Sequence, residues 1–245
     1  MTCRKKGLFF CLGALFFSSC AARITGNIEA AGSGDFVVSA ALQPRISLLI
    51  RSLSAAMGDG TAPEFIIDGA AIARSMTAAP GISSVSFRNT GPAAVEGPVK
   101  ISRIGDFLAT AGGPDAKKSF IAFEQAPPGS SGPSRCTITL NRDSGPEILS
   151  LFSPEVSGYL SALMAPIATG EALTQNEYFA AVSSVYGQAI ADEIRTGSMR
   201  VSIQFPGPIS AVKGGAWSGN RAEFDIPLGD LLVLETPLEY EVRWK

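Results

Sequence analysis

The N-terminal stretch most constrains the fold, because it decides which residues are available to form a domain. Three basic residues at positions 4–6 precede an uncharged apolar run at residues 7–17, and two serines follow. A positive segment, a short apolar segment and small residues at the cut make up a secretory signal peptide. The run is too short for a transmembrane helix, which needs about 20 apolar residues. We therefore expect residues 1–19 to be a signal peptide and residues 20–245 to form a single domain.

A cysteine follows the two small residues directly: Ser18 and Ser19 precede Cys20. This order resembles the lipobox of bacterial lipoproteins, in which a signal peptidase cuts before a cysteine that carries a diacylglyceryl thioether. The resemblance implies cleavage between Ser19 and Cys20 and lipid attachment at Cys20. The lipobox prefers Leu at the position that Phe17 occupies in this chain. Other residues at that position resemble the relaxed lipobox of spirochaete lipoproteins. The alternatives are an ordinary signal peptide with an incidental cysteine, or a short buried apolar segment.

Acyl chains on Cys20 are expected to hold the protein on a membrane without a spanning helix. Each buried methylene group contributes about 0.8 kcal/mol, so several chains such as palmitate make a stable lipid anchor. The expected location is the bacterial cell envelope, on the periplasmic face or at the cell surface.

The charge balance argues against nucleic acid as a partner. Residues 1–19 hold three of the 20 basic residues and none of the 22 acidic ones, so residues 20–245 carry a formal net charge of −5. Phosphate backbones are bound by basic surfaces, which this composition does not favour. The apolar fraction of 46% is sufficient for a substantial core.

The cysteine and histidine content excludes a disulfide framework and several kinds of catalytic site. Cys3 and Cys11 leave with the signal peptide and Cys20 is modified, so Cys136 has no partner for a disulfide. We expect Cys136 to be a buried, unreactive thiol in a strand. The chain has no histidine, which excludes Ser-His-Asp and Cys-His catalysis and most catalytic zinc sites. No phosphate-loop pattern is present, and neither a cofactor nor a metal is expected.

The order of the predicted elements is strands, helices, strands, helices, strands. This order is typical of the α+β class, here a mostly antiparallel sheet with three to five amphipathic helices packed on it. Thr174 and Glu177 form a capping box, Asp68 is a predicted N-cap, and Gly187 is expected to break a helix. Strands are predicted at residues 22–29, 35–42, 82–89, 95–103, 119–125, 134–141, 199–205, 222–227 and 238–244. Helices are predicted at residues 44–57, 68–76, 146–152, 153–167 and 174–194, with a short turn or helix at 228–234.

Ser210 and Lys213 match a short Ser-x-x-Lys pattern, in which a lysine activates a serine nucleophile. The pattern expects the serine to open a helix. Ser210 instead follows a Pro-Gly-Pro segment and precedes two glycines, so we predict that it lies in a surface turn between strands and is not catalytic. A turn is also predicted at residues 213–220.

Two pairs of carboxylates share strand faces, namely Glu223 with Asp225 and Glu239 with Glu241. Paired carboxylates can perform acid–base chemistry or bind a hard cation. Alternating charge on an antiparallel strand is also what a solvated face looks like, and this interpretation is favoured.

Four aromatic residues lie on the two longest predicted helices: Tyr159, Tyr178, Phe179 and Tyr186. We expect them to pack in the core between helices and sheet. A groove between such helices and a curved sheet is also a natural place for an acyl chain.

The C-terminal part of the chain resembles the ending of the mycobacterial lipoprotein M type. Residues 201–207 form a strand that closes with Pro-Gly, Lys213 and two glycines follow as a turn, and residues 219–228 return as a strand. The resemblance implies an envelope domain that contacts lipid, and it transfers no functional residue. The chain as a whole looks like a spirochaete lipoprotein.

The sequence thus favours a non-enzymatic envelope lipoprotein with a membrane-anchored domain that binds a lipid or an envelope protein. The alternatives are a serine hydrolase or transferase that uses Ser210 and Lys213, and a structural or adhesive surface lipoprotein.

Overall fold

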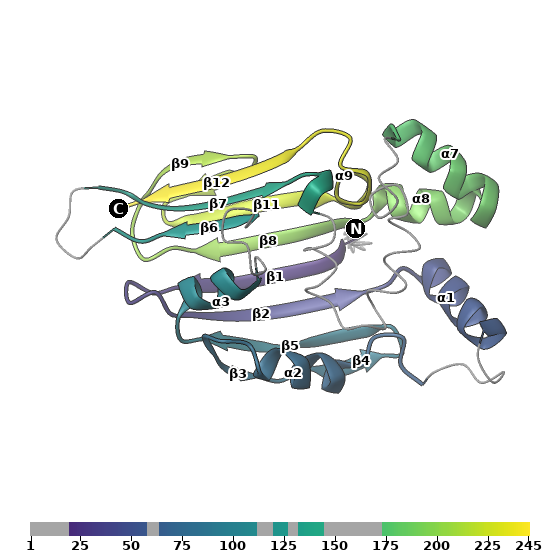
Figure 1. The fold of residues 1–245 in the computed structure, drawn as a ribbon, viewed down its shortest axis with the longest axis horizontal. Helices are drawn as coiled ribbons and strands as arrows, with labels where there is room; N and C mark the ends of the chain where they lie inside the picture. Colours follow the sequence, from purple (N-terminus) through teal and green to yellow (C-terminus); the bar gives the residue numbers. More distant parts are fainter. Residues whose placement is uncertain (1–19, 58–63, 112–119, 127–131, 145–172) are drawn as a thin grey trace, which may run out of the picture.

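The computed structural model describes residues 20–57, 64–111, 120–126, 132–144 and 173–245. Two β-sheets are formed there, and helices α1(Pro44–Met57), α7(Gln175–Tyr186) and α8(Gln188–Thr196) lie at one end of them (Figure 1). The larger sheet has eight strands in the order β10-β11-β8-β1-β2-β5-β3, with β4 also paired to β5. The smaller sheet has four strands in the order β6-β7-β12-β9. The larger sheet comprises β1(Cys20–Ile28), β2(Gly34–Ala41), β3(Ile82–Val85), β4(Arg88–Gly91), β5(Ala94–Ile101), β8(Ser198–Gln204), β10(Ala216–Ser218) and β11(Arg221–Pro227). The smaller sheet comprises β6(Ile121–Glu124), β7(Ser134–Leu140), β9(Ile209–Lys213) and β12(Leu238–Trp244).

Strand β1 lies in the middle of the larger sheet. It pairs antiparallel with β2 through a hairpin whose turn contains Gly32 at a φ of 82°, a left-handed conformation that favours glycine. On its other side β1 pairs with β8, and this pair is parallel. It is the one parallel pair in the part of the chain that the structure describes, and it joins the two ends of that part in one sheet.

Three helix boundaries fall where the local sequence predicts them, whereas the helix at Ile104–Ala111 was not predicted. Asp68 accepts hydrogen bonds from the backbone N–H groups of Ala70 and Ala71 at the start of α2. Thr174 and Glu177 form the predicted capping box of α7, and Gly187, at a φ of 93°, separates α7 from α8. The described helices are α1(Pro44–Met57), α2(Gly69–Thr77), α3(Ile104–Ala111), α7(Gln175–Tyr186), α8(Gln188–Thr196) and α9(Leu228–Val233).

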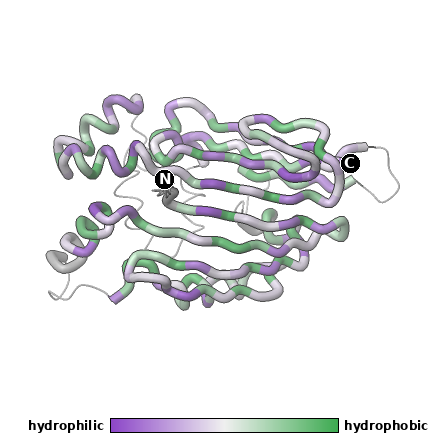
Figure 2. Tube along the Cα trace, turned by 180° about the vertical axis from the view of Figure 1, so that it is seen from behind, coloured by the Kyte–Doolittle hydropathy of each residue, from purple (hydrophilic) through white to green (hydrophobic). Residues whose placement is uncertain are grey.

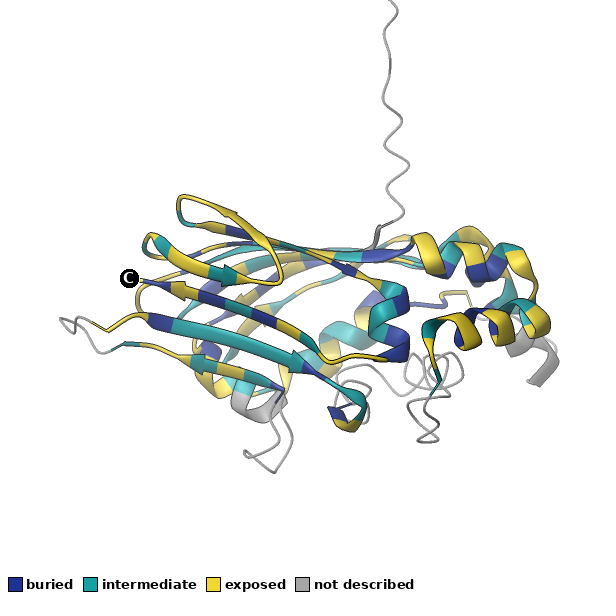
Figure 3. Cartoon of the chain, turned by 90° about the horizontal axis from the view of Figure 1, so that it is seen from above, coloured by how far each residue is buried: buried dark blue, intermediate teal, exposed yellow. Residues whose placement is uncertain are grey.

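The core consists of two clusters. One lies between the sheets, where Val99, Ile203 and Trp244 are buried and the ring of Phe205 packs at a tilt against Trp244, with ring centroids 4.6 Å apart. The other lies beneath the helices and includes residues of α1, α7 and α8. Hydrophobic and hydrophilic residues alternate along the strands (Figure 2), and buried residues alternate with exposed ones (Figure 3). One face of the larger sheet is therefore buried and the other faces solvent.

The α+β class with mostly antiparallel pairing and packed helices is confirmed, although the strands form two sheets. The strand predicted at 82–89 is divided into β3 and β4. The turn predicted at residues 213–220 is wrong in part, because β10 forms within it and pairs with β11. The helices predicted at 146–152 and 153–167 lie outside the described residues.

Proline donates no backbone hydrogen bond and is typical of a sheet edge or bulge, yet Pro98 lies in β5, which pairs with strands on both sides. The N–H group of Ser86 donates to the carbonyl oxygen of Pro98 at 3.1 Å. The N and C=O groups of a strand residue point to the same side of the strand. The nitrogen of Pro98, which carries no hydrogen, therefore faces the break between β3 and β4. The missing donor thus falls where the ladder is already interrupted.

Gly97 makes this break possible, and its replacement is a test of the packing. A Cβ atom at Gly97 would lie 1.8 Å from the carbonyl oxygen of Ser86. We predict that Gly97→Ala lowers the free energy of unfolding by about 1–3 kcal/mol, because backbone must move. Urea denaturation measures the change.

The matched control is Gly105→Ala in α3, where nothing lies within 4 Å of the added Cβ. We expect this change to leave stability unchanged or to raise it by about 0.5–1 kcal/mol, as alanine favours a helix. Equal midpoints for Gly97→Ala and the wild-type protein would contradict the packing described here.

Candidate functional site

The predicted lipid-attachment residue lies at the start of the central strand. Cys20 is the first residue of β1, and its backbone is paired with that of Ser198 at the start of β8. No residue of the expected mature chain separates Cys20 from the sheet. Lipid attachment itself, and cleavage after Ser19, stay predictions.

The topology places a helix on each side of this position. Strand β2 runs antiparallel to β1, so β2 ends where β1 begins, and α1 follows it after two residues. Strand β8 runs parallel to β1, so it begins at the same end, and α8 precedes it with Gly197 between them. Helices α1 and α8 therefore flank the start of β1 (Figure 1).

A carboxylate of α8 caps the N-terminus of α1. Pro44 has no N–H group, and the first turn of α1 contains no acidic residue. Glu193 of α8 accepts hydrogen bonds at 3.0 Å from the backbone N–H groups of both Arg45 and Ile46. These are N–H groups without a partner inside the helix, and a negative charge there also favours the helix dipole. Glu193 thus fixes α1 against α8.

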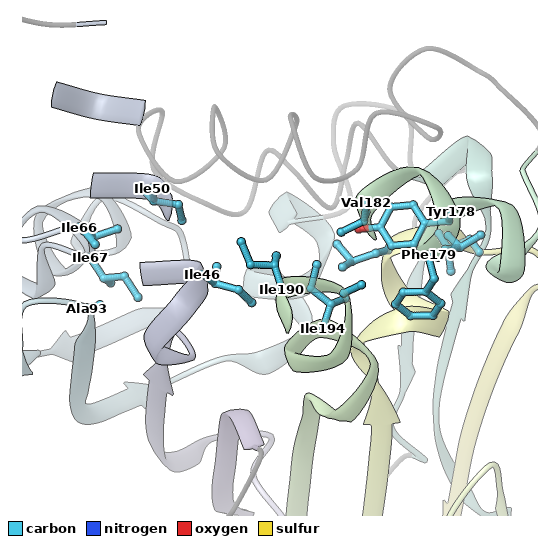
Figure 4. Close-up of a cluster of buried hydrophobic side chains, with 14 of the residues drawn as sticks. Ile46, Ile50, Ile66, Ile67, Ala93, Tyr178, Phe179, Val182, Ile190 and Ile194 are labelled. Carbon is cyan, nitrogen blue, oxygen red and sulfur yellow. The ribbon is translucent and has the colours of Figure 1, made fainter. Parts of the chain in front are cut away.

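An apolar cluster fills the space between the same helices. Ile46 and Ile50 of α1 and Ile190 and Ile194 of α8 are buried in one cluster. Figure 4 shows Ile46 facing Ile190 and Ile194. The apolar face of α1 is therefore core, as the sequence favoured.

Two apolar side chains on the helices at this end remain in solvent. Leu48 of α1 is 64% exposed and Val185 of α7 is 70% exposed. Single exposed apolar residues are common on protein surfaces. Leu48 and Val185 lie at the end of the domain where β1 begins. They therefore bear on function only together with the proposed lipid on Cys20.

Ser210 and Lys213 have separate partners. Both lie on β9, where the sequence predicted a turn for Ser210. The Ser210 hydroxyl donates to the carbonyl oxygen of Arg243 at 3.2 Å, and the Lys213 ammonium group bonds to Glu239. Successive side chains of a strand alternate between its faces, so residues three apart lie on opposite faces. The structure does not bring these two side chains together.

Glu223, Asp225 and Glu239 are exposed, as expected, whereas the side chain of Glu241 is only 15% exposed. Glu241 accepts hydrogen bonds from Arg135, at 2.6 Å, and from Arg243. Burial raises the pKa of Glu241, but the hydrogen bonds and charges of these two arginines outweigh it, so the pKa lies below its ordinary value. Among the described residues, no group of three or more His, Cys, Asp or Glu residues could hold a metal ion.

The described aromatic residues on the helices are core residues. Tyr178 is 2% exposed and Phe179 is 6% exposed, with ring centroids 5.4 Å apart in an edge-to-face arrangement. Burial raises the pKa of Tyr178. Tyr159 lies outside the described residues.

Cys136 is a free thiol in β7, and burial raises its pKa to about 11. The raised pKa agrees with the expected unreactive thiol, since nucleophilic cysteines have lowered pKa values.

Comparisons with known proteins give one structural similarity. No family model matches the sequence, and no curated protein matches it either. The folded domain of LppM from Mycobacterium tuberculosis, solved by NMR, is similar with a TM-score of 0.40 and 8% sequence identity. The similarity covers 95% of this chain and 94% of that chain. At this identity no residue of one protein corresponds securely to a residue of the other. The resemblance to spirochaete lipoproteins stays a prediction.

The described helices include none that is long and apolar enough to cross a bilayer.

The capping of α1 by Glu193 can be measured directly. We predict that Glu193→Ala lowers the free energy of unfolding by about 1 kcal/mol, the usual effect of losing an N-terminal cap. The matched variant Glu193→Gln keeps an oxygen acceptor and should lose less. Urea denaturation of the three proteins tests this order, and an equal loss in both variants would contradict the capping role.

Proposed function

We propose that this chain is a non-enzymatic lipoprotein of a bacterial cell envelope that binds a lipid or an envelope protein. A lipid on Cys20 holds it on the membrane, on the periplasmic face or at the cell surface. The observation that supports the proposal best is the start of β1 at Cys20. A lipid at this position leaves no flexible tether, so the domain stays against the bilayer.

If Cys20 carries the proposed lipid, the fold around it implies which end of the domain approaches the membrane. Helices α1 and α8 flank the start of β1, so the helical end lies nearest the lipid. Exposed Leu48 and Val185 are carried by α1 and by the neighbouring α7. Apolar side chains at a bilayer surface add favourable burial to that of the acyl chains.

The absence of histidine from the sequence and the separate partners of Ser210 and Lys213 support a non-enzymatic role. A nucleophilic serine needs a base within hydrogen-bond reach. The Lys213 ammonium group is instead paired with Glu239.

Lipid attachment is tested by feeding cells a palmitate analogue that can be detected after purification of the protein. We predict that the wild-type chain and Cys136→Ser incorporate the label, whereas Cys20→Ser does not. Label retained in Cys20→Ser, or lost in Cys136→Ser, would overturn the assignment of Cys20.

The non-enzymatic role is tested with a fluorophosphonate probe, which labels activated serines. We predict no labelling of the purified full chain, and therefore no difference between wild type and Ser210→Ala. Labelling that disappears in Ser210→Ala would establish the hydrolase alternative instead.

A further inference from the structure

The solvent-facing side of the larger sheet carries an ordered set of polar side chains on three adjacent strands. The register places Arg23 of β1 beside Arg200 of β8, and Arg200 beside Asp225 of β11. Two residues further along β1 and β8, on the same face, Thr25 lies beside Ser202, and Ser202 lies beside Glu223 of β11. We call these six residues the polar array: Arg23, Thr25, Arg200, Ser202, Glu223 and Asp225.

The polar array lines a surface depression of about 630 Å³. The backbone of Gly214 and Gly215, at the turn between β9 and β10, forms part of its wall. Sites for small molecules commonly have volumes of about 300–1,000 Å³. The depression is therefore large enough for a small polar ligand.

The two arginines of the array are not neutralised equally. The Nε atom of Arg200 lies 3.7 Å from a carboxylate oxygen of Asp225, and both side chains are about half exposed. The side chain of Arg23 has no hydrogen bond or ion pair with any described residue. Like charges opposite each other on neighbouring strands repel, so the pair of arginines is unfavourable without an anion. An anion between the two guanidinium groups removes that cost.

Hydroxyl groups lie next to the arginines on the same strands. The Ser202 hydroxyl oxygen accepts a hydrogen bond from Arg221 at 3.3 Å, which leaves the hydroxyl proton able to donate to a ligand. Thr25 provides a second hydroxyl on the neighbouring strand. Guanidinium and hydroxyl donors on one surface suit the several acceptor oxygens of a phosphate group.

The third strand adds the opposite charge. Glu223 and Asp225 of β11 line the same depression, one strand away from Ser202 and Arg200. Adjacent strands are about 4.8 Å apart. A ligand that spans the depression therefore meets cations at one side and carboxylates at the other, so a plain anion satisfies only half of it.

We propose that the polar array binds a zwitterionic phosphate ester of the phosphoethanolamine type. The phosphate group lies between Arg23 and Arg200, and Thr25 and Ser202 donate hydrogen bonds to it. The ammonium group faces Glu223 and Asp225. The exposed Arg200–Asp225 contact is worth little on its own, so a ligand can replace it at small cost.

The same chemistry can come from a soluble ester or from a phospholipid headgroup. Arg23 lies three residues beyond Cys20 on β1, about 10 Å at 3.3 Å per residue. If the proposed anchor is correct, headgroups of the membrane lie within reach of the array. Binding of the soluble ester does not depend on the anchor.

The test titrates phosphoethanolamine and inorganic phosphate into the full chain in maltoside micelles, with binding measured by calorimetry. We expect Arg23→Gln and Arg200→Gln each to weaken binding of phosphoethanolamine about tenfold, the loss of one charged hydrogen-bonded contact. Glu223→Gln should weaken binding of phosphoethanolamine but strengthen binding of inorganic phosphate. This opposite response identifies a zwitterionic ligand, since loss of a carboxylate helps an anion and harms an ammonium group.

The matched control is Arg88→Gln, which removes one positive charge from another exposed position of the same sheet. It should bind phosphoethanolamine as the wild-type protein does. Any one of three results would overturn the proposal. The wild-type chain does not bind phosphoethanolamine, Arg88→Gln weakens binding as much as Arg23→Gln does, or Glu223→Gln changes the binding of both ligands in the same direction.

A competition experiment separates the two sources of the ligand. Phosphatidylethanolamine is added to the micelles while soluble phosphoethanolamine is titrated. Competition that is lost in Arg23→Gln supports a lipid headgroup as the ligand, and undisturbed binding of the soluble ester supports a free ester. The palmitate label on Cys20 is a separate readout, so failure of the anchor and failure of the array are distinguishable.

Discussion

The structure depends on the parallel pairing of β1 with β8. Without it, β1, β2 and β5 form one group of strands, and β8, β11 and β10 form another. The pairing joins them in one sheet and brings Cys20 to the level of Ser198. It also decides the position of the helices, because α1 leaves β2 and α8 enters β8 at that same end. The side-by-side placement of Arg23 and Arg200 follows from the same register.

The sequence predicted the features that depend on neighbours within a few residues. The capping box at Thr174, the N-cap at Asp68 and the break at Gly187 are local hydrogen-bonding or backbone requirements, and all were correct. The short strand β10 was missed because its three residues lie between the glycine turns at Gly214 and Gly219, which dominate the local signal. Short strands of this kind are decided by their partners, here β11.

The polar array could not be predicted for a different reason. Arg23, Arg200 and Glu223 lie on strands whose adjacency depends on the β1–β8 pairing, and nothing near any of them indicates it. Glu223 and Asp225 were recognised as part of a solvated face, which their exposure confirms, but their arginine neighbours were not. The local signal that could have helped is polar alternation at Arg23, Thr25 and Asn27, three polar residues on one face of the first strand.

The β1–β8 pairing also has a consequence for biosynthesis. The N-terminal strands leave the ribosome first, yet β1 keeps one edge open until the segment from Ser198 onward has been made. An open strand edge in the middle of a nascent sheet is prone to pair with other chains. Closing so long a loop costs chain entropy and is slow. Productive folding therefore needs the whole polypeptide to arrive in one compartment, and a chaperone that shields the exposed edge of β1 would protect it during the delay.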